Sequence, residues 1–195
     1  MEENRMSSLK MIVIGGSAGS LEIILNIVSE LPLNSGYCCV IIVHRKYTLD
    51  SILEDLFSSK TVLTVKEVED KELIIPGTIY LAPPDYHLLF ENNSTFSLDA
   101  SEKIHFSRPS IDVSFESAAQ VFGASAIGVL LSGANADGAI GLQTIESAGG
   151  LIIIQDPETA DVGYMPAQGL KITQRPVVIP GNAIGKYLHS ILNSP

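Results

Sequence analysis

Runs of apolar residues alternate along most of the chain with amphipathic segments. The first run, residues 11–14, leads directly into a segment in which apolar residues recur at helical spacing as far as Pro32. A second run, residues 37–43, is apolar throughout, which is typical of a strand buried on both faces of a parallel sheet. The pattern continues with a predicted helix over residues 50–57 and with predicted strands over residues 61–68 and 78–83. The first part of the chain therefore predicts repeated strand–helix–strand units.

The middle of the chain departs from this rhythm. Two short strands, residues 86–91 and 94–98, flank Asn92-Asn93 and predict an antiparallel hairpin. The rhythm then returns, with predicted helices over residues 108–121, 139–148, 165–170 and 183–192 and predicted strands over residues 126–131, 151–155 and 177–179. The sequence therefore predicts a doubly wound, mostly parallel α/β sheet, Rossmann-like, with an antiparallel hairpin at one edge.

Length and composition fit one such domain. The 195 residues are 46% hydrophobic and 17% charged, which suits a compact protein with a buried sheet. We expect a single domain over residues 1–195, with residues 1–8 as a disordered N-terminus. The formal net charge of −10 argues against a nucleic-acid partner, because phosphate binding needs a basic surface. Direct membrane insertion is not expected either, since every apolar run is too short to cross a bilayer.

The two cysteines, Cys38 and Cys39, are adjacent in an apolar strand. Neighbouring Cα atoms lie about 3.8 Å apart, which is below the usual range of about 4.4–6.8 Å for a disulfide. We interpret both as reduced core residues of a cytoplasmic protein. Histidines at metal-binding spacing and clusters of cysteines are both missing, so we expect neither a metal nor a cofactor.

A glycine-rich turn joins the first strand to the first helix, and it carries Ser17. Residues 15–19 read G-x-S-x-G, the pattern of a nucleophile on a sharp strand-to-helix elbow. A phosphate cradle is the commoner use of such a turn. The glycine spacing is wrong for a dinucleotide fingerprint, however, and the chain has no Gly-Lys-Ser/Thr. The remaining alternative is that Ser17 only caps the helix.

Three residues with complementary chemistry follow three different predicted strands. Ser17 follows the first strand, His44 the second, and Asp137 the strand over residues 126–131. Because ligands bind beyond the carboxyl ends of parallel strands, nucleophile, base and orienting carboxylate can converge there. Each residue also has an ordinary structural reading, as a helix cap, a surface histidine and an Asp-Gly turn. The case for a site is the coincidence of the three.

Other assignments of the chemistry are weaker. His87, His105 and His189 are rival bases, the first two in or near the hairpin and the third in the last predicted helix. An α/β-hydrolase also uses G-x-S-x-G, but there the acid precedes the histidine and an oxyanion loop precedes the serine. Here Ser17 follows the first strand, so no earlier part of the sheet can supply that loop.

The chain resembles a known family in the segments IGGSAG (14–19), VH (43–44), LAPPDYH (81–87), RPSID (108–112), LLSGANADGAIG (130–141), DPETA (156–160) and MP (165–166). The family is the catalytic domain of the CheB-type chemotaxis receptor methylesterases, and the resemblance extends from about Leu9 to Leu192. It implies a serine hydrolase that removes methyl esters from receptor glutamates and often deamidates glutamine. It places Ser17, His44 and Asp137 in the triad and implies a methylated chemoreceptor as partner.

The chain also departs from the usual family pattern. The family commonly has Thr at the position of Ala18, Gln-His-Met at residues 43–45 and Thr-Gly-Met-Gly at residues 132–135. These positions line the cleft, so they bear on substrate preference more than on the chemistry. The receiver domain that usually gates the enzyme is not in this sequence, and we expect any receiver or kinase to be a separate protein. The expected oxyanion donors are the backbone N–H groups of Ala18 and Ala134.

Three basic residues are expected at the rim of the cleft. Arg45 and Lys46 follow His44, and Arg108 opens the helix after the hairpin. They would offset the negative field of the protein near an acidic receptor, and the alternative is that they are ordinary solvated charges. Two other functions stay open from the sequence: a non-catalytic module of the same fold that docks a receptor or kinase, and a small-ligand sensor.

Overall fold

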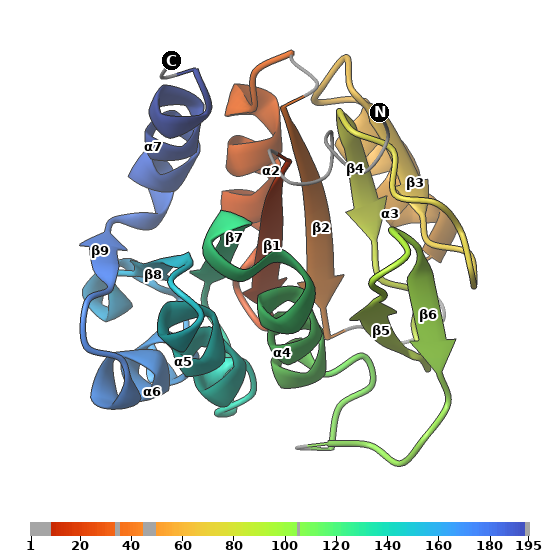
Figure 1. The fold of residues 1–195 in the computed structure, drawn as a ribbon. Coiled ribbons are helices and arrows are strands. Elements are labelled where there is room, and N and C mark those ends of the chain that lie inside the picture. Colours follow the sequence, from red (N-terminus) through yellow and green to blue (C-terminus); the bar gives the residue numbers. More distant parts are fainter. Residues whose placement is uncertain (1–8, 34–35, 45–49, 105, 194–195) are drawn as a thin grey trace.

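The protein is described here from a computed structural model, which describes residues 9–33, 36–44, 50–104 and 106–193. The predicted N-terminal tail, residues 1–8, lies outside these ranges. The described residues form a seven-stranded parallel sheet of order β3-β4-β2-β1-β7-β8-β9 (Figure 1). Its strands are β1 (Lys10–Gly16), β2 (Tyr37–Val43), β3 (Thr64–Glu67), β4 (Thr78–Leu81), β7 (Ala126–Leu130), β8 (Leu151–Gln155) and β9 (Val177–Ile179). The predicted doubly wound α/β class is confirmed.

Helices cover both faces of the sheet. One face packs against α2 (Leu21–Glu30), α3 (Asp50–Ser58) and α7 (Gly181–Leu192), and the other against α4 (Ile111–Phe122), α5 (Ala139–Ser147) and α6 (Tyr164–Ile172). Alternate residues of β1 serve the two cores: Met11 and Val13 face α4, while Ile12 and Ile14 face α2. All four side chains are fully buried, which is why the first run of the sequence is apolar without alternation.

The predicted hairpin is present, and it forms a sheet of its own. Strands β5 (His87–Phe90) and β6 (Phe96–Asp99) pair in antiparallel fashion, separate from the main sheet. The reason is the apolar face of the hairpin. Phe96 packs edge-on against Tyr80 of β4 with ring centroids 4.8 Å apart, and Phe90 contacts Phe122 of α4. The hairpin therefore covers the sheet beside α4 and does not extend it sideways.

Helix α4 begins later than the sequence pattern predicted. Pro109 was expected in its first turn, but the helix starts at Ile111 with Ser110 as its N-cap, and the Arg108–Pro109 peptide bond is cis. The Ser110 side chain accepts a hydrogen bond from Val113 N, as N-cap serines do. With this start, the first N–H groups of α4, those of Ile111 and Asp112, are directed toward the Asp137 carboxylate.

The loops that carry the chemistry leave the same edge of the sheet. Gly16 is in register with Val43 across β1 and β2, and Gly15 with Leu130 across β1 and β7. Ser17, His44 and the loop after β7 therefore start side by side at the carboxyl ends of three adjacent strands.

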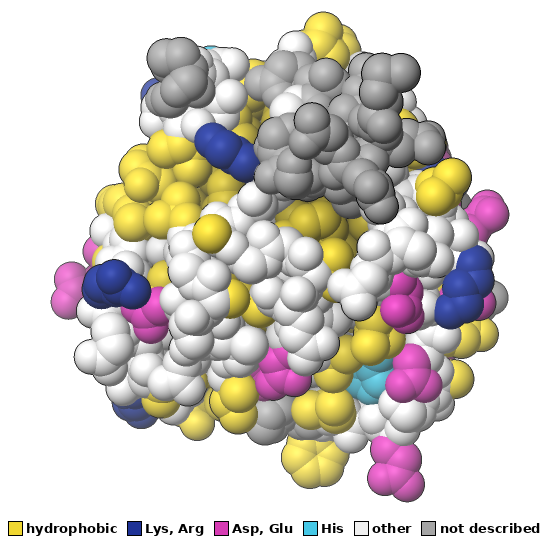
Figure 2. All heavy atoms as spheres, in the orientation of Figure 1, with side chains coloured by type: hydrophobic (Ala, Val, Ile, Leu, Met, Phe, Trp, Pro, Cys, Tyr) yellow, Lys and Arg dark blue, Asp and Glu magenta, His cyan; other side chains and the backbone are white. Residues whose placement is uncertain are grey.

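Two further features concern the charged surface and the length of the helices. Figure 2 shows one face of the molecule, on which the described Lys and Arg side chains are scattered and form no continuous basic patch. Among the described residues, no helix combines the length and the apolar character that a membrane crossing requires.

Candidate active site

Ser17 has a fixed main chain and an available hydroxyl. Its N–H donates to the Ser132 carbonyl oxygen at 2.9 Å, and its carbonyl accepts from the N–H and the hydroxyl of Ser20 at 3.1 and 2.8 Å. The side chain is partly exposed, and no described residue forms a hydrogen bond with its Oγ. The turn thus presents a hydroxyl that no side chain or backbone group in the described part of the chain engages.

The alternative that Ser17 caps the first helix is wrong. Helix α2 begins at Leu21 with Ser20 at the N-cap position. The left-handed backbone conformation in this turn is taken by Gly19, with φ +78°, and not by Ser17. Gly16 is needed for space, because a β-carbon there would lie 2.6 Å from Ser20 Cβ. The glycines shape the turn, and Ser17 is left free for chemistry.

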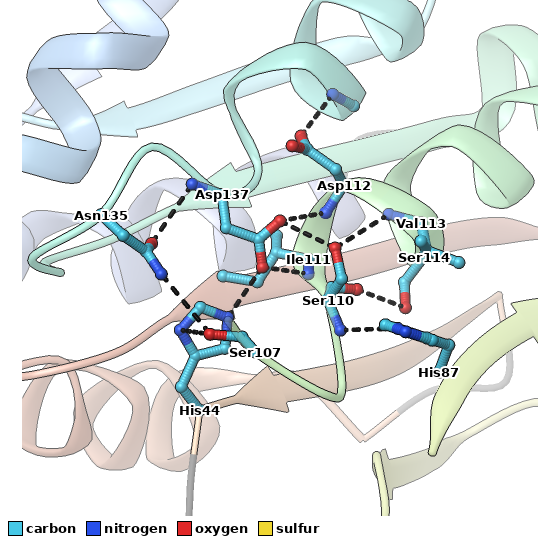
Figure 3. Close-up of polar contacts among 11 residues, drawn as sticks. His44, His87, Ser107, Ser110, Ile111, Asp112, Val113, Ser114, Asn135 and Asp137 are labelled. Atoms are coloured by element: carbon cyan, nitrogen blue, oxygen red, sulfur yellow. Dashed lines mark hydrogen bonds and ion pairs between the residues drawn. The ribbon is translucent and has the colours of Figure 1, made fainter. Parts of the chain in front are cut away.

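His44 and Asp137 are in direct contact although 93 positions separate them (Figure 3). His44 Nε2 lies 2.8 Å from Asp137 Oδ2. The Asp137 side chain is fully buried, whereas 11% of the His44 side chain is exposed. A buried carboxylate bonded to a partly exposed imidazole is the arrangement in which the acid fixes the ring and the ring meets a substrate.

The Asp137 carboxylate is held by the N-terminus of α4. Besides His44, it accepts hydrogen bonds from the Ser110 hydroxyl at 2.8 Å, Ile111 N at 2.7 Å and Asp112 N at 3.0 Å. Burial by itself raises the pKa of this carboxyl, but the hydrogen bonds from His44 and from the Asp112 and Ile111 N–H groups outweigh burial and hold the pKa below its ordinary value. The free N–H groups and the dipole of the helix both favour the ionised form. Asp137 is therefore a carboxylate at neutral pH.

Two of the three rival histidines, His87 and His189, have partners away from Ser17. His87 is buried; its Nδ1 accepts from Ser110 N at 3.1 Å, and its Nε2 lies 2.9 Å from the Glu102 carbonyl oxygen. It therefore ties the loop before α4 to the start of that helix. His189 is exposed on α7, where its Nδ1 contacts the Glu30 carbonyl. His105 lies outside the described residues.

Ser132 and Gln155 brace the turn that carries Ser17, and neither was predicted from the sequence. The Ser132 hydroxyl donates to the Ala18 carbonyl at 2.7 Å and accepts from Val162 N at 2.9 Å. The Ser132 N–H donates to the buried Gln155 side chain at 3.0 Å. A polar residue at the end of a buried apolar strand, as Gln155 is in β8, is the signal that could have pointed to it.

The two N–H groups proposed for an oxyanion are unoccupied by protein groups within the described chain. Ala18 and Ala134 are exposed, and no described residue accepts a hydrogen bond from either backbone N–H. The preceding N–H group on each loop has an acceptor: Ser17 N donates to the Ser132 carbonyl, and Gly133 N donates to the Val162 carbonyl at 3.0 Å. The N–H groups of Ala18 and Ala134 therefore have no acceptor among the described residues, and the same holds for those of Gly19 and Asn135 on the same two loops.

Of the three basic residues expected at the rim of the cleft, the structure describes Arg108. Arg108 Nη1 donates to the carbonyls of Ala100 and Ser101, so this guanidinium supports the loop before α4. Arg45 and Lys46 lie outside the described residues.

The remaining candidates for chemistry are the two cysteines and a metal site. Burial raises the pKa of the Cys38 thiol to about 12 and also raises that of Cys39, so both cysteines are protonated and unreactive at neutral pH. No group of three His, Cys, Asp or Glu side chains in the described part of the chain is placed to hold a metal ion.

Comparisons with known proteins identify the family of the chain. A relative from Leptospira interrogans is 46% identical over 166 residues, which are 83% of this chain and 84% of that protein. A protein-glutamate methylesterase/protein-glutamine glutaminase of Thermotoga maritima is 35% identical over 182 residues, 92% of this chain and 53% of that longer protein. The crystal structure of the Thermotoga maritima CheB methylesterase catalytic domain matches with a TM-score of 0.87 and 33% identity, covering 94% of this chain and 99% of that one. The family model for the CheB methylesterase matches residues 12–188. The chain therefore belongs to the CheB methylesterase family.

Proposed function

We propose that this protein is a serine hydrolase that removes methyl esters from glutamate side chains of chemotaxis-type receptors. The observation that carries the proposal is the 2.8 Å contact between His44 and the buried, ionised Asp137, at the strand edge where Ser17 offers its hydroxyl. Relatives of the family are named for glutamate demethylation and for glutamine deamidation together. Both reactions pass through the same glutamyl-serine ester, and they differ in the leaving group, methanol or ammonia.

The first half of the reaction uses His44 as base. Because Nε2 faces Asp137, the nitrogen that takes the Ser17 proton is Nδ1. The Ser17 oxygen attacks the ester carbonyl, and the N–H groups of Ala18 and Ala134 stabilise the oxyanion that forms. Loss of one such donor typically costs about 10²–10³ in rate. Protonated His44 then gives its proton to the departing methoxide, so that methanol leaves and the acyl-enzyme remains.

The second half repeats these steps with water. His44 takes a proton from the water as it attacks the acyl-enzyme, and the oxyanion forms in the same place. Collapse of that intermediate returns the proton to Ser17 and releases the glutamate side chain as a carboxylate. Asp137 stays ionised throughout and stabilises the imidazolium in both halves.

The partner of this reaction is a methylated chemoreceptor or a similar signalling protein. A separate receiver or kinase protein would supply the regulation that the resemblance implies. The two unreactive, unpaired cysteines fit a reducing compartment, and we place the reaction in the cytoplasm.

The proposal is tested by labelling and turnover together. A fluorophosphonate should attach to the wild-type protein, and peptide mapping should place it on Ser17. Ser17→Ala should abolish both labelling and methanol release from methylated receptor while leaving the thermal unfolding midpoint nearly unchanged, since the Ser17 hydroxyl makes no described hydrogen bond.

A matched serine controls for the loss of a hydroxyl. Ser29 is exposed on α2 and bonds only the Asn26 carbonyl among the described residues, so Ser29→Ala should keep wild-type labelling and turnover. Methanol release at the wild-type rate from Ser17→Ala would end the nucleophile assignment. A wild-type protein that binds the receptor but neither labels nor releases methanol would be the docking module considered above.

A further inference from the structure

The second ring nitrogen of His44 also has a partner. Ser107 Oγ lies 3.3 Å from His44 Nδ1, on the opposite side of the ring from Asp137 (Figure 3). This is the nitrogen that the proposed reaction needs as proton acceptor. Ser107 belongs to the loop between β6 and α4, and the proposed function gives it no role so far.

Ser107 is one member of a closed ring of hydrogen bonds. Asn135 Nδ2 lies 3.5 Å from Ser107 Oγ, and Asn135 Oδ1 accepts from Asp137 N at 3.2 Å. His44 and Asp137 complete the ring through their 2.8 Å contact. Four residues from three loops thus enclose the imidazole and its carboxylate.

The direction of each bond in this ring follows from the chemistry of the groups. The Asn135 carbonyl oxygen already accepts from Asp137 N, so the group that faces Ser107 is the NH₂, which can only donate. Ser107 Oγ accepts that bond, and its own hydrogen remains for His44 Nδ1. Nδ1 is then an acceptor, and the ring proton is on Nε2, where the Asp137 carboxylate accepts it.

The loop holds Ser107 firmly in this place. Ser107 and Ile104 exchange two backbone hydrogen bonds of 2.8 and 3.2 Å, which close a tight turn. Arg108 and His87 tie the same loop back through the carbonyls of Ala100 and Glu102. The contact with His44 is therefore built on a braced segment.

We infer that Ser107 is a positioning residue for His44, supported by Asn135. It holds the ring plane and favours the imidazole tautomer whose hydrogen is on Nε2. Nδ1 has a single in-plane lone pair, so the Ser107 hydroxyl first rotates its hydrogen away and Nδ1 then takes the Ser17 proton. The Ser107 oxygen can accept weakly from the new Nδ1–H until that proton passes to the departing methoxide. This inference rests on the proposed function, since it assigns Ser107 a part in the proton transfer of that site.

The test compares two substitutions at Ser107 in the full chain. Ser107→Ala should lower kcat for methanol release about tenfold and leave KM for methylated receptor within about twofold, as expected for loss of one hydrogen bond to the base. Ser107→Thr keeps the hydroxyl and should restore most of the rate. Ser101→Ala, at an exposed serine of the same loop, should behave as the wild type.

A second readout does not depend on activity. In the ¹⁵N NMR spectrum of the wild type, His44 Nδ1 should resonate as a hydrogen-bonded acceptor. Ser107→Ala should shift that resonance toward the position of a free imidazole nitrogen, while the Nε2 proton stays directed at Asp137. Ser107→Thr should restore the wild-type position of the His44 Nδ1 resonance.

The outcomes separate this inference from the proposed function. If the wild type labels at Ser17 while Ser107→Ala keeps the wild-type kcat and Nδ1 resonance, the positioning role is wrong and the proposed function stands. An increase in kcat would mean that Ser107 blocks the base, which also overturns the role. A label that maps to Ser107 in the wild type would overturn both.

Discussion

Asp137 shows how a single residue can be buried and charged together. Its side chain has no exposed surface, and four hydrogen bonds replace the water that it has lost. Two of the four come from backbone N–H groups of α4, which cannot move without unwinding the helix. The carboxylate is thereby fixed in position and in charge before any substrate arrives, and both properties can be tested by one substitution.

Replacing Asp137 with Asn should change stability in a pH-dependent way. The pKa of Asp137 is lowered by folding, so its charge stabilises the folded protein above its unfolded pKa of about 3.9, and this contribution is lost as pH falls through the lower folded value. The difference in unfolding free energy between wild type and Asp137→Asn should be constant near neutral pH and shrink below about pH 4. Urea unfolding at several pH values measures it. A difference that is equally large at pH 3 and pH 7 would contradict the assignment.

The same substitution should nearly stop turnover. An Asn side chain can present its NH₂ to Nε2 and so favour the proton on Nδ1, which then cannot accept from Ser17. In a serine protease triad the equivalent change costs about 10⁴ in kcat, and we expect a loss of that order in methanol release with little change in KM. Receptor binding, measured separately, should persist.

Residue chemistry could be predicted from the sequence only where an uncommon residue type follows a strand. His44 and Asp137 were identified because a histidine and an aspartate stood at the ends of buried apolar runs, and the structure brings them together. Ser107 and Ser110 were missed because serines between a hairpin and a helix are ordinary turn and cap residues. Their importance depends on which distant side chain each one meets, and no local pattern contains that information.

At the scale of elements, the start of α4 has two functions. Its N-cap, Ser110, bonds the helix through Val113 N and the carboxylate through Asp137 Oδ1. Ser110→Ala should therefore lower the free energy of unfolding by about 1–2 kcal/mol, as expected for loss of a cap and of one buried hydrogen bond. It should also reduce kcat, though far less than Asp137→Asn does. Thermal unfolding and methanol release, with Ser29→Ala as the control, give both values; a change in stability alone would show that Ser110 does not matter to the carboxylate.

Elements were predicted best where their ends are marked locally. Strands β2, β8 and β9 have the predicted bounds. β8 and β9 end directly before Asp156-Pro157 and Pro180, which break strands, and β2 follows Gly36 and ends where its apolar run gives way to His44. The hairpin was predicted as an edge of the main sheet, whereas it packs its aromatic face on Tyr80 and α4. Tertiary packing decides which sheet a strand joins. The alternation of apolar and polar residues along a hairpin is the same whether the hairpin extends the main sheet or packs on it as a separate sheet.

At the scale of the whole molecule, charge sets the conditions for capture of the receptor. A protein of net charge −10 repels an acidic receptor helix unless the rim of the cleft is locally positive. Arg108 directs Nη1 to carbonyls of its own loop, so this guanidinium is engaged within the protein. Arg45 and Lys46, directly after His44 in the sequence, are the basic residues that we predict to steer the receptor.

Salt and charge reversal should then act on capture and not on chemistry. If Arg45 and Lys46 attract the receptor, kcat/KM for methylated receptor should fall as salt rises, because the screening length is only about 8 Å at physiological ionic strength. Reversing both charges to Glu should lower kcat/KM for the receptor and leave hydrolysis of a small neutral ester nearly unchanged. A kcat/KM that rises with salt in the wild type would mean that net repulsion dominates and that no steering rim exists. Equal losses on both substrates would mean instead that the two residues shape the catalytic site itself.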